Sequence, residues 1–181
     1  MADKEKKTRG RRRFLDDYRP VGGKFVYVGA YYCFNGDSAV HRRFGRVTVA
    51  CALAAVAVAV AVGCMRQGGF DRPYVLLPYV ASLIAGAFAV YDAVRLANAG
   101  EKLNREQYET GAKRLPGAAL AQGIALALAA LGQAGYLIFD RAGLRLPNDV
   151  LGLVGLLAAA AAAVVLYKTA RAAAWTEKPQ A

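Results

Sequence analysis

Four long stretches of this chain carry no formally charged side chain, and this feature constrains the fold more than any other. The stretches are residues 47–65, 73–91, 115–139 and 150–167. A helix needs roughly 20 apolar residues to cross a hydrocarbon core of about 30 Å, and each stretch meets or approaches that length. We therefore predict an all-α integral membrane protein, folded as an antiparallel bundle of four transmembrane helices.

The composition leaves little chain for anything besides these spans. Of 181 residues, 56% are hydrophobic and only 20% are charged. We expect three parts: a basic cytoplasmic tail with an aromatic segment at residues 1–46, a four-helix transmembrane domain at 47–175, and a short cytoplasmic tail at 176–181. The last helix is expected to continue beyond its apolar span, with Trp175 as a membrane-interface residue.

The basic residues are unevenly distributed between the segments that flank the spans. Twenty of the 24 Lys and Arg residues precede the first span, lie in the middle loop or follow the last span, and only four lie in the other two loops. The positive-inside rule then places both termini and the middle loop in the cytoplasm. No eukaryotic targeting signal is evident, so we expect a multi-pass protein of a bacterial cell membrane.

The basic N-terminus also bears on partners. A cluster at residues 9–13 contains four arginines, and basic residues near an anionic membrane contribute about 1 kcal/mol each. The formal net charge of +11 would suggest nucleic-acid binding in a soluble chain, but no nucleic-acid-binding module is recognisable. The expected partners are the lipid bilayer, anionic lipid headgroups and other membrane protein subunits, with no nucleic acid.

An aromatic segment follows the basic tail. Residues 21–24 form a turn signal, residues 25–34 are rich in Val, Tyr and Phe, and Asn35-Gly36 is a second turn signal. This pattern predicts a short cytoplasmic strand or hairpin. Two strands alone are marginally stable in water, so we expect the aromatic side chains to lie on lipid headgroups or on a partner. The candidate docking residues are Phe25, Tyr27, Tyr31, Tyr32 and Phe34.

Small and polar residues indicate which faces of the spans pack together. In the second span Ser82 and Gly86 fall on one face and Ile84 on the opposite face. Close approach of small residues holds helices together in lipid. In the third span Gln122 and Gln133 lie about 16 Å apart on one face. They either line a polar pathway or hydrogen-bond to neighbouring helices, and we favour the second interpretation.

One acidic residue falls near the end of a span. Asp92 lies about 30 Å along the second helix, which is headgroup depth. We interpret it as an interface anchor paired with Arg95 or Arg46, in preference to a proton-coupling residue. The middle loop that follows is rich in helix formers at residues 101–108, which predicts a short amphipathic helix there.

The sequence contains no motif that identifies a reaction. Paired acids, a nucleophile beside a base and metal-ligand spacings are all missing, and Cys33, Cys51 and Cys64 are widely separated. We therefore predict no catalytic, cofactor-binding or metal-binding residues. The leading hypothesis is a non-enzymatic accessory or scaffold subunit of a membrane assembly. The alternative is a small transporter or channel component that uses the polar face of the third transmembrane helix.

Overall fold

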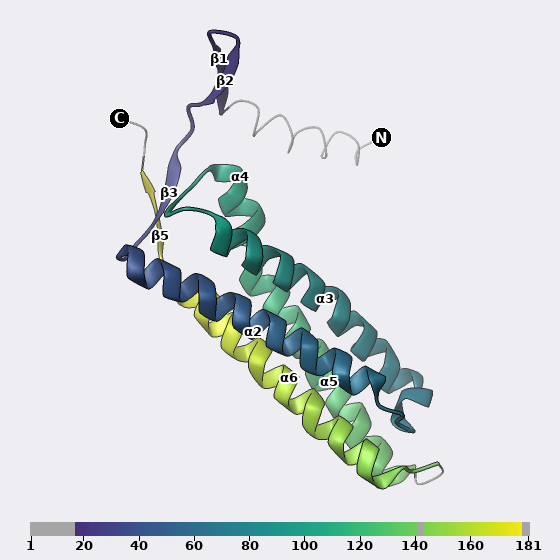
Figure 1. Cartoon of the computed structure of the whole chain (residues 1–181). Helices are drawn as coiled ribbons and strands as arrows, with labels where there is room; N and C mark the ends of the chain where they lie inside the picture. Colours follow the sequence, from purple (N-terminus) through teal and green to yellow (C-terminus); the bar gives the residue numbers. More distant parts are fainter. Residues whose placement is uncertain (1–16, 141–142, 179–181) are drawn as a thin grey trace, which may run out of the picture.

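The computed structural model describes residues 17–140 and 143–178, and about 73% of these described residues are helical. Four helices account for most of it (Figure 1): α2 (Ser38–Cys64), α3 (Pro73–Asn98), α5 (Leu115–Phe139) and α6 (Leu146–Ala172). All four are long and apolar enough to cross a membrane, which confirms the predicted number of candidate spans. Because α2 begins at Ser38, the expected boundary at residue 46 falls inside this helix.

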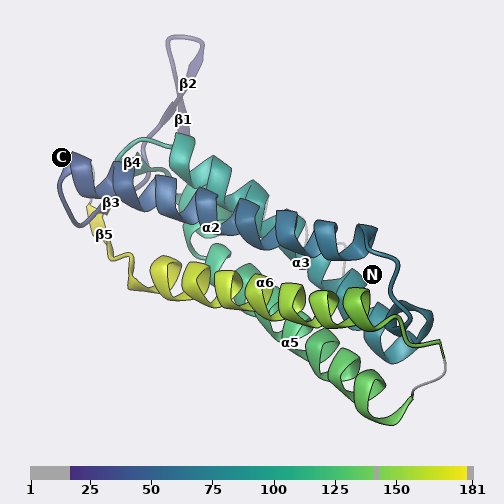
Figure 2. The ribbon, with the colours of Figure 1, turned by 60° about the horizontal axis from the view of Figure 1, so that its bottom comes forward.

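The four helices lie side by side in a closed ring (Figure 2). Helix α3 packs against α2 and α5, and α6 packs against α5 and α2. The ring has two different ends. We call the end that carries the strands and residues 98–114 the sheet end. We call the end that carries residues 65–72, Asp140 and residues 143–145 the loop end.

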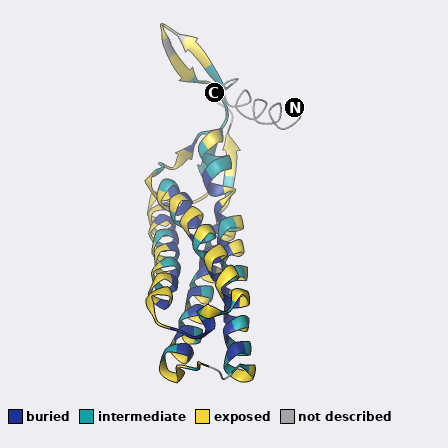
Figure 3. Ribbon diagram, turned by 90° about the vertical axis from the view of Figure 1, so that its right-hand side faces the viewer, coloured by how far each residue is buried: buried dark blue, intermediate teal, exposed yellow. Residues whose placement is uncertain are grey.

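The interior of the bundle is built largely from small residues. On α3, Ser82, Gly86 and Ala89 are buried, whereas Ile84 on the opposite face is exposed, as the sequence pattern predicted. Figure 3 shows exposed residues along the outer faces of the helices and buried residues along their inner faces. Many large apolar side chains, such as Leu77, Ile84 and Leu131, are exposed, where a bilayer would cover them.

The N-terminal β segment begins with a hairpin. Strands β1 (Tyr18–Val21) and β2 (Lys24–Tyr27) pair antiparallel and extend away from the bundle in Figure 1. Gly22 and Gly23 join them with φ values of +58° and +80°, which suits the type I′ turns of two-residue hairpins. The predicted turn is therefore present, although it is followed by a strand of only four residues.

A second sheet joins distant parts of the chain. Strand β3 (Tyr31–Phe34) lies between β4 (Lys102–Leu103) and β5 (Trp175–Lys178), and both neighbours pair with it antiparallel. The strand or hairpin expected at residues 25–34 is thus divided between β2 and β3, with residues 28–30 outside both strands. The last helix ends at Ala172, so Trp175 does not continue it, and residues 176–178 of the expected tail belong to β5.

The connection between α3 and α5 is only partly helical. After β4 come one short turn of helix, α4 (Arg105–Gln107), and a π-helical turn, η2 (Tyr108–Ala112). Asn104 caps α4 because its Oδ1 accepts from Gln107 N at 2.7 Å, while Gln107 Oε1 accepts from Asn104 N at 3.2 Å. The prediction of an amphipathic helix at 101–108 is wrong for the first half of that range, because Lys102 and Leu103 pair with β3 as a strand.

Candidate docking segment and polar sites

Two of the five candidate docking aromatics pack against the chain itself. Tyr32 stacks on Tyr108 with ring centroids 4.0 Å apart. Phe34 contacts Trp175 edge-on at 5.3 Å and lies 5.5 Å from Phe44. Both are partly buried around the apolar cluster at the sheet end. The expectation that lipid or a partner must cover these side chains does not hold for these two, because Tyr108 of η2, Phe44 of α2 and Trp175 of β5 pack on them.

Tyr27 anchors the base of the hairpin. Its hydroxyl donates to the Ala30 carbonyl at 2.8 Å and accepts from Arg105 N at 3.0 Å. Its ring meets Tyr18 and Tyr31 edge-on, with centroids 5.3 and 5.1 Å apart. Burial raises the pKa of the Tyr27 phenol, and the hydrogen bond from the Arg105 amide opposes that rise. Tyr27 thus attaches the hairpin to the loop between α3 and α5.

Phe25 differs from the other four aromatics because little of the chain covers it. Its side chain is 76% exposed on β2, and the adjacent Val26 is 46% exposed. Both residues lie between the Tyr27 anchor and the Gly22–Gly23 turn of the hairpin. The candidate docking segment therefore has three parts. Tyr32 and Phe34 pack against the chain, Tyr27 anchors the base of the hairpin, and Phe25 is exposed.

The two glutamines of α5 are both buried but have different surroundings. Gln133 Nε2 donates to the Asp149 carbonyl of α6 at 3.2 Å, an interhelical hydrogen bond of the kind predicted. Gln122 is 1% exposed, and neither its Nε2 nor its Oε1 has a hydrogen-bond partner among residues 17–140 and 143–178. It lies against Gly86, where an added Cβ would come within 2.7 Å of Gln122 Nε2. The favoured interpretation therefore does not hold for Gln122.

Asp149 is a buried carboxylate that the sequence analysis missed. Its Oδ1 accepts from Gly68 N at 2.9 Å, and its Oδ2 accepts from Arg145 N at 2.6 Å. Gln133 Nε2 lies 3.4 Å from Oδ1. The sequence feature that could have drawn attention to Asp149 is its place in the first turn of a helix, where the helix dipole favours negative charge. That feature does not reveal burial, which depends on residues 67–69 folding inward against α6.

Asp92 is also fully buried, but its partner is neither Arg95 nor Arg46. Arg114, at the start of α5, donates through Nε to Asp92 Oδ2 at 2.7 Å and forms a second bond to Oδ1. Arg95 instead bonds to Thr110 Oγ1 at 2.9 Å. The prediction considered Arg95 on the same helix and Arg46 at the start of the first span, but no residue at the start of the third span, whereas α5 packs directly against α3. Ser82 donates to the Tyr79 carbonyl of its own helix at 2.6 Å.

Two further features bear on function. Within the part of the chain that the structure describes, no three His, Cys, Asp or Glu side chains gather closely enough to hold a metal ion. The basic cluster at residues 9–13, expected to contact anionic lipid headgroups, lies outside the described residues. Comparison with protein-family models, with curated proteins and with solved structures finds no match to this chain.

Proposed function

We propose that this chain is a non-enzymatic accessory or scaffold subunit of a membrane assembly, which docks a partner through its β1–β2 hairpin. The supporting observation is the contrast between two aromatic residues of one strand. The Tyr27 hydroxyl accepts a hydrogen bond from the Arg105 amide, yet Phe25 is 76% exposed. An exposed aromatic on a fixed support suits recognition, because little conformational entropy is lost on binding.

The proposal includes an orientation. With twenty of 24 Lys and Arg residues at the sheet end or in the segments that flank it, the sheet end and both termini face the cytoplasm. Native cysteines allow a direct test, because Cys33 lies on β3 and Cys64 ends α2 at the loop end. In single-cysteine variants, a membrane-impermeant maleimide should label Cys64 in intact cells and Cys33 only after permeabilisation. Labelling of Cys33 in intact cells would reverse the orientation.

Docking is tested with two equivalent substitutions at opposite ends of the bundle. Phe139, the last residue of α5, is 87% exposed and provides a control for Phe25. Mild-detergent purification of the full chain should recover a defined set of co-purifying subunits. Phe25→Ser should remove a subunit that Phe139→Ser retains, with both variants inserted and equally abundant. Identical recovery from both variants would contradict docking through the hairpin.

A second candidate function is a small transporter or channel component, and Gln122 favours it. A buried amide without a hydrogen-bond partner in the described chain is costly, so a functional role would explain its presence. Under the scaffold proposal, Gln122→Leu leaves cellular function intact. Loss of function in Gln122→Leu, with normal insertion and with docking retained, would favour the transporter. Gln133→Leu is not an equivalent test, because Gln133 Nε2 also donates to the Asp149 carbonyl and lies beside its carboxylate.

A further inference from the structure

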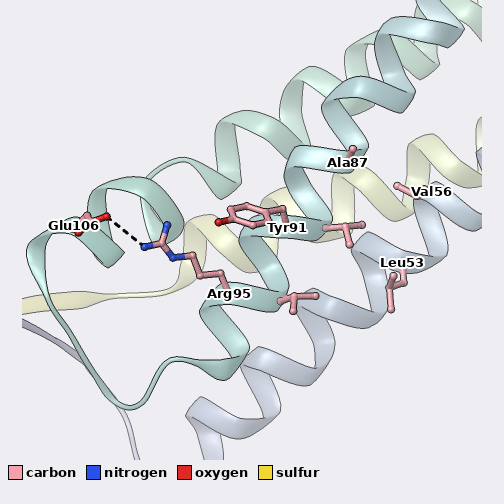
Figure 4. A pocket seen from close by; sticks show the side chains of 8 residues that line it. Leu53, Val56, Ala87, Tyr91, Arg95 and Glu106 are labelled. Atoms are coloured by element: carbon pink, nitrogen blue, oxygen red, sulfur yellow. Dashed lines mark ion pairs between the residues drawn. The ribbon is translucent and has the colours of Figure 1, made fainter. Parts of the chain in front are cut away.

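A groove of about 930 Å³ runs between α2 and α3 on the outer surface of the bundle (Figure 4). Leu53 and Val56 line it from α2, and α3 contributes a second apolar wall. The α3 wall consists of Ala87, Val90, Tyr91 and Val94. Such a volume lies in the range of roughly 300–1,000 Å³ found for small-molecule sites. In a membrane-spanning bundle this groove opens sideways toward lipid.

Close contacts between α2 and α3 lie at both ends of the groove. Toward the loop end, an added Cβ on Gly86 would come within 2.7 Å of Val56 Cγ2. Toward the sheet end, an added Cβ on Gly45 would lie 3.2 Å from Ala97 Cα. The two helices therefore approach through backbone contact at Gly45 and through the Val56 side chain at Gly86, and these two contacts set the spacing of the groove walls.

One end of the groove is ionic. Arg95 of α3 and Glu106 of α4 complete the lining there, and Figure 4 shows the two side chains facing one another. Arg95 Nη2 and Glu106 Oε1 are 3.9 Å apart, which is too far for a direct hydrogen bond. Thr110 Oγ1, in the π-helical turn, accepts from Arg95 Nη1 at 2.9 Å and thereby positions the guanidinium. Both charged groups retain capacity for a ligand.

We propose that this groove binds a phosphatidylethanolamine-type lipid. One acyl chain lies along the apolar walls, Arg95 binds the phosphate, and Glu106 accepts hydrogen bonds from the primary ammonium. Guanidinium groups suit phosphate oxygens, and a carboxylate bonds well to an ammonium N–H. A choline headgroup offers no N–H to Glu106, and a glycerol headgroup offers no positive charge. The pair of opposite charges therefore selects a zwitterionic headgroup with N–H donors.

The test uses the purified full chain in mild detergent. Native mass spectrometry compares binding of phosphatidylethanolamine, phosphatidylcholine and phosphatidylglycerol with identical acyl chains. We expect the ethanolamine lipid to bind about tenfold more tightly than the others, as one ionic hydrogen bond would provide. Glu106→Gln should remove the preference over phosphatidylglycerol, and Arg95→Gln should weaken binding of every phospholipid. Arg171→Gln, on α6 outside the groove lining, is the control and should change neither.

A second variant tests the apolar walls. Ala87→Phe should block the acyl chain without altering either charged group, so it should lower binding of all three lipids while secondary structure and elution volume stay unchanged. Equal binding of the three lipids by the unsubstituted chain would overturn the proposal. An ethanolamine preference that survives both Arg95→Gln and Glu106→Gln would also overturn it. The proposal does not rest on docking through the hairpin, and neither test affects Phe25.

Discussion

The two ends of this bundle are built in opposite ways. At the loop end, backbone N–H groups of Gly68 and Arg145 point inward to one buried carboxylate, Asp149. At the sheet end, the buried carboxylate Asp92 is bonded to the side chain of Arg114, which is 45% exposed. Beyond it, strands from three parts of the chain meet and the hairpin extends outward.

The loop end mainly closes the bundle, whereas the sheet end exposes side chains that can bind a partner. At the loop end, internal donors satisfy the Asp149 carboxylate, and the connecting segment at residues 67–69 is buried. The sheet end keeps charged and aromatic groups at its surface, including Phe25, Arg95 and Glu106. An end that closes on itself contributes mainly stability, whereas an end with exposed groups on a fixed support is suited to binding. Substitutions at the two ends should therefore have different consequences.

The largest effect on stability is expected for Asp149→Ala. This change leaves the buried Gly68 N–H and the Arg145 N–H without their acceptor and removes the carboxylate beside Gln133, and we expect the free energy of unfolding to fall by about 3 kcal/mol. Unfolding in mixed micelles with increasing denaturing detergent provides the measurement. The control is Asp140→Ala, which breaks the partly exposed ion pair with Arg72 at the same end and should cost less than about 1 kcal/mol. Equal losses for the two variants would contradict internal closure of the loop end.

Asp92→Ala should have a smaller effect, about 1.5 kcal/mol, although Asp92 is as deeply buried as Asp149. The reason is that the released Arg114 guanidinium is half-exposed and can be hydrated, whereas the buried Gly68 N–H at Asp149 cannot. The same unfolding assay compares the two alanine variants directly. A loss for Asp92→Ala as large as that for Asp149→Ala would show that the two ends do not differ as described.

The smallest effects on stability are expected for alanine substitutions of two glycines, Gly152 at the loop end and Gly111 at the sheet end. A methyl group on Gly152 would overlap the buried Gln67 amide and displace its 2.7 Å bond to the Val62 carbonyl, so Gly152→Ala should cost about 1 kcal/mol. At the sheet end, an added Cβ on Gly111 meets nothing within 4 Å. Gly111→Ala should be neutral or stabilise the chain by up to about 1 kcal/mol. A destabilising Gly111→Ala would contradict the open packing of this segment.

The sequence predicted the features that depend on short-range periodicity. Charge-free stretches gave the number of spans, and the small residues around Gly86 identified the inner face of α3. Pairings between distant residues were missed. Strand β3 is covered by β4 and β5, Asp92 pairs across helices with Arg114, and Asp149 is buried only because residues 67–69 fold back. No local pattern encodes which distant segment supplies a partner.

Docking through the hairpin is tested most directly in the native membrane. A photo-reactive phenylalanine analogue is placed at Phe25 and, in a separate variant, at the equally exposed Phe139 of the loop end. Illumination should join position 25 to a discrete protein, and Phe139 should yield no such product. Cross-linking of position 25 only to lipid, or the same protein product from both positions, would contradict the account.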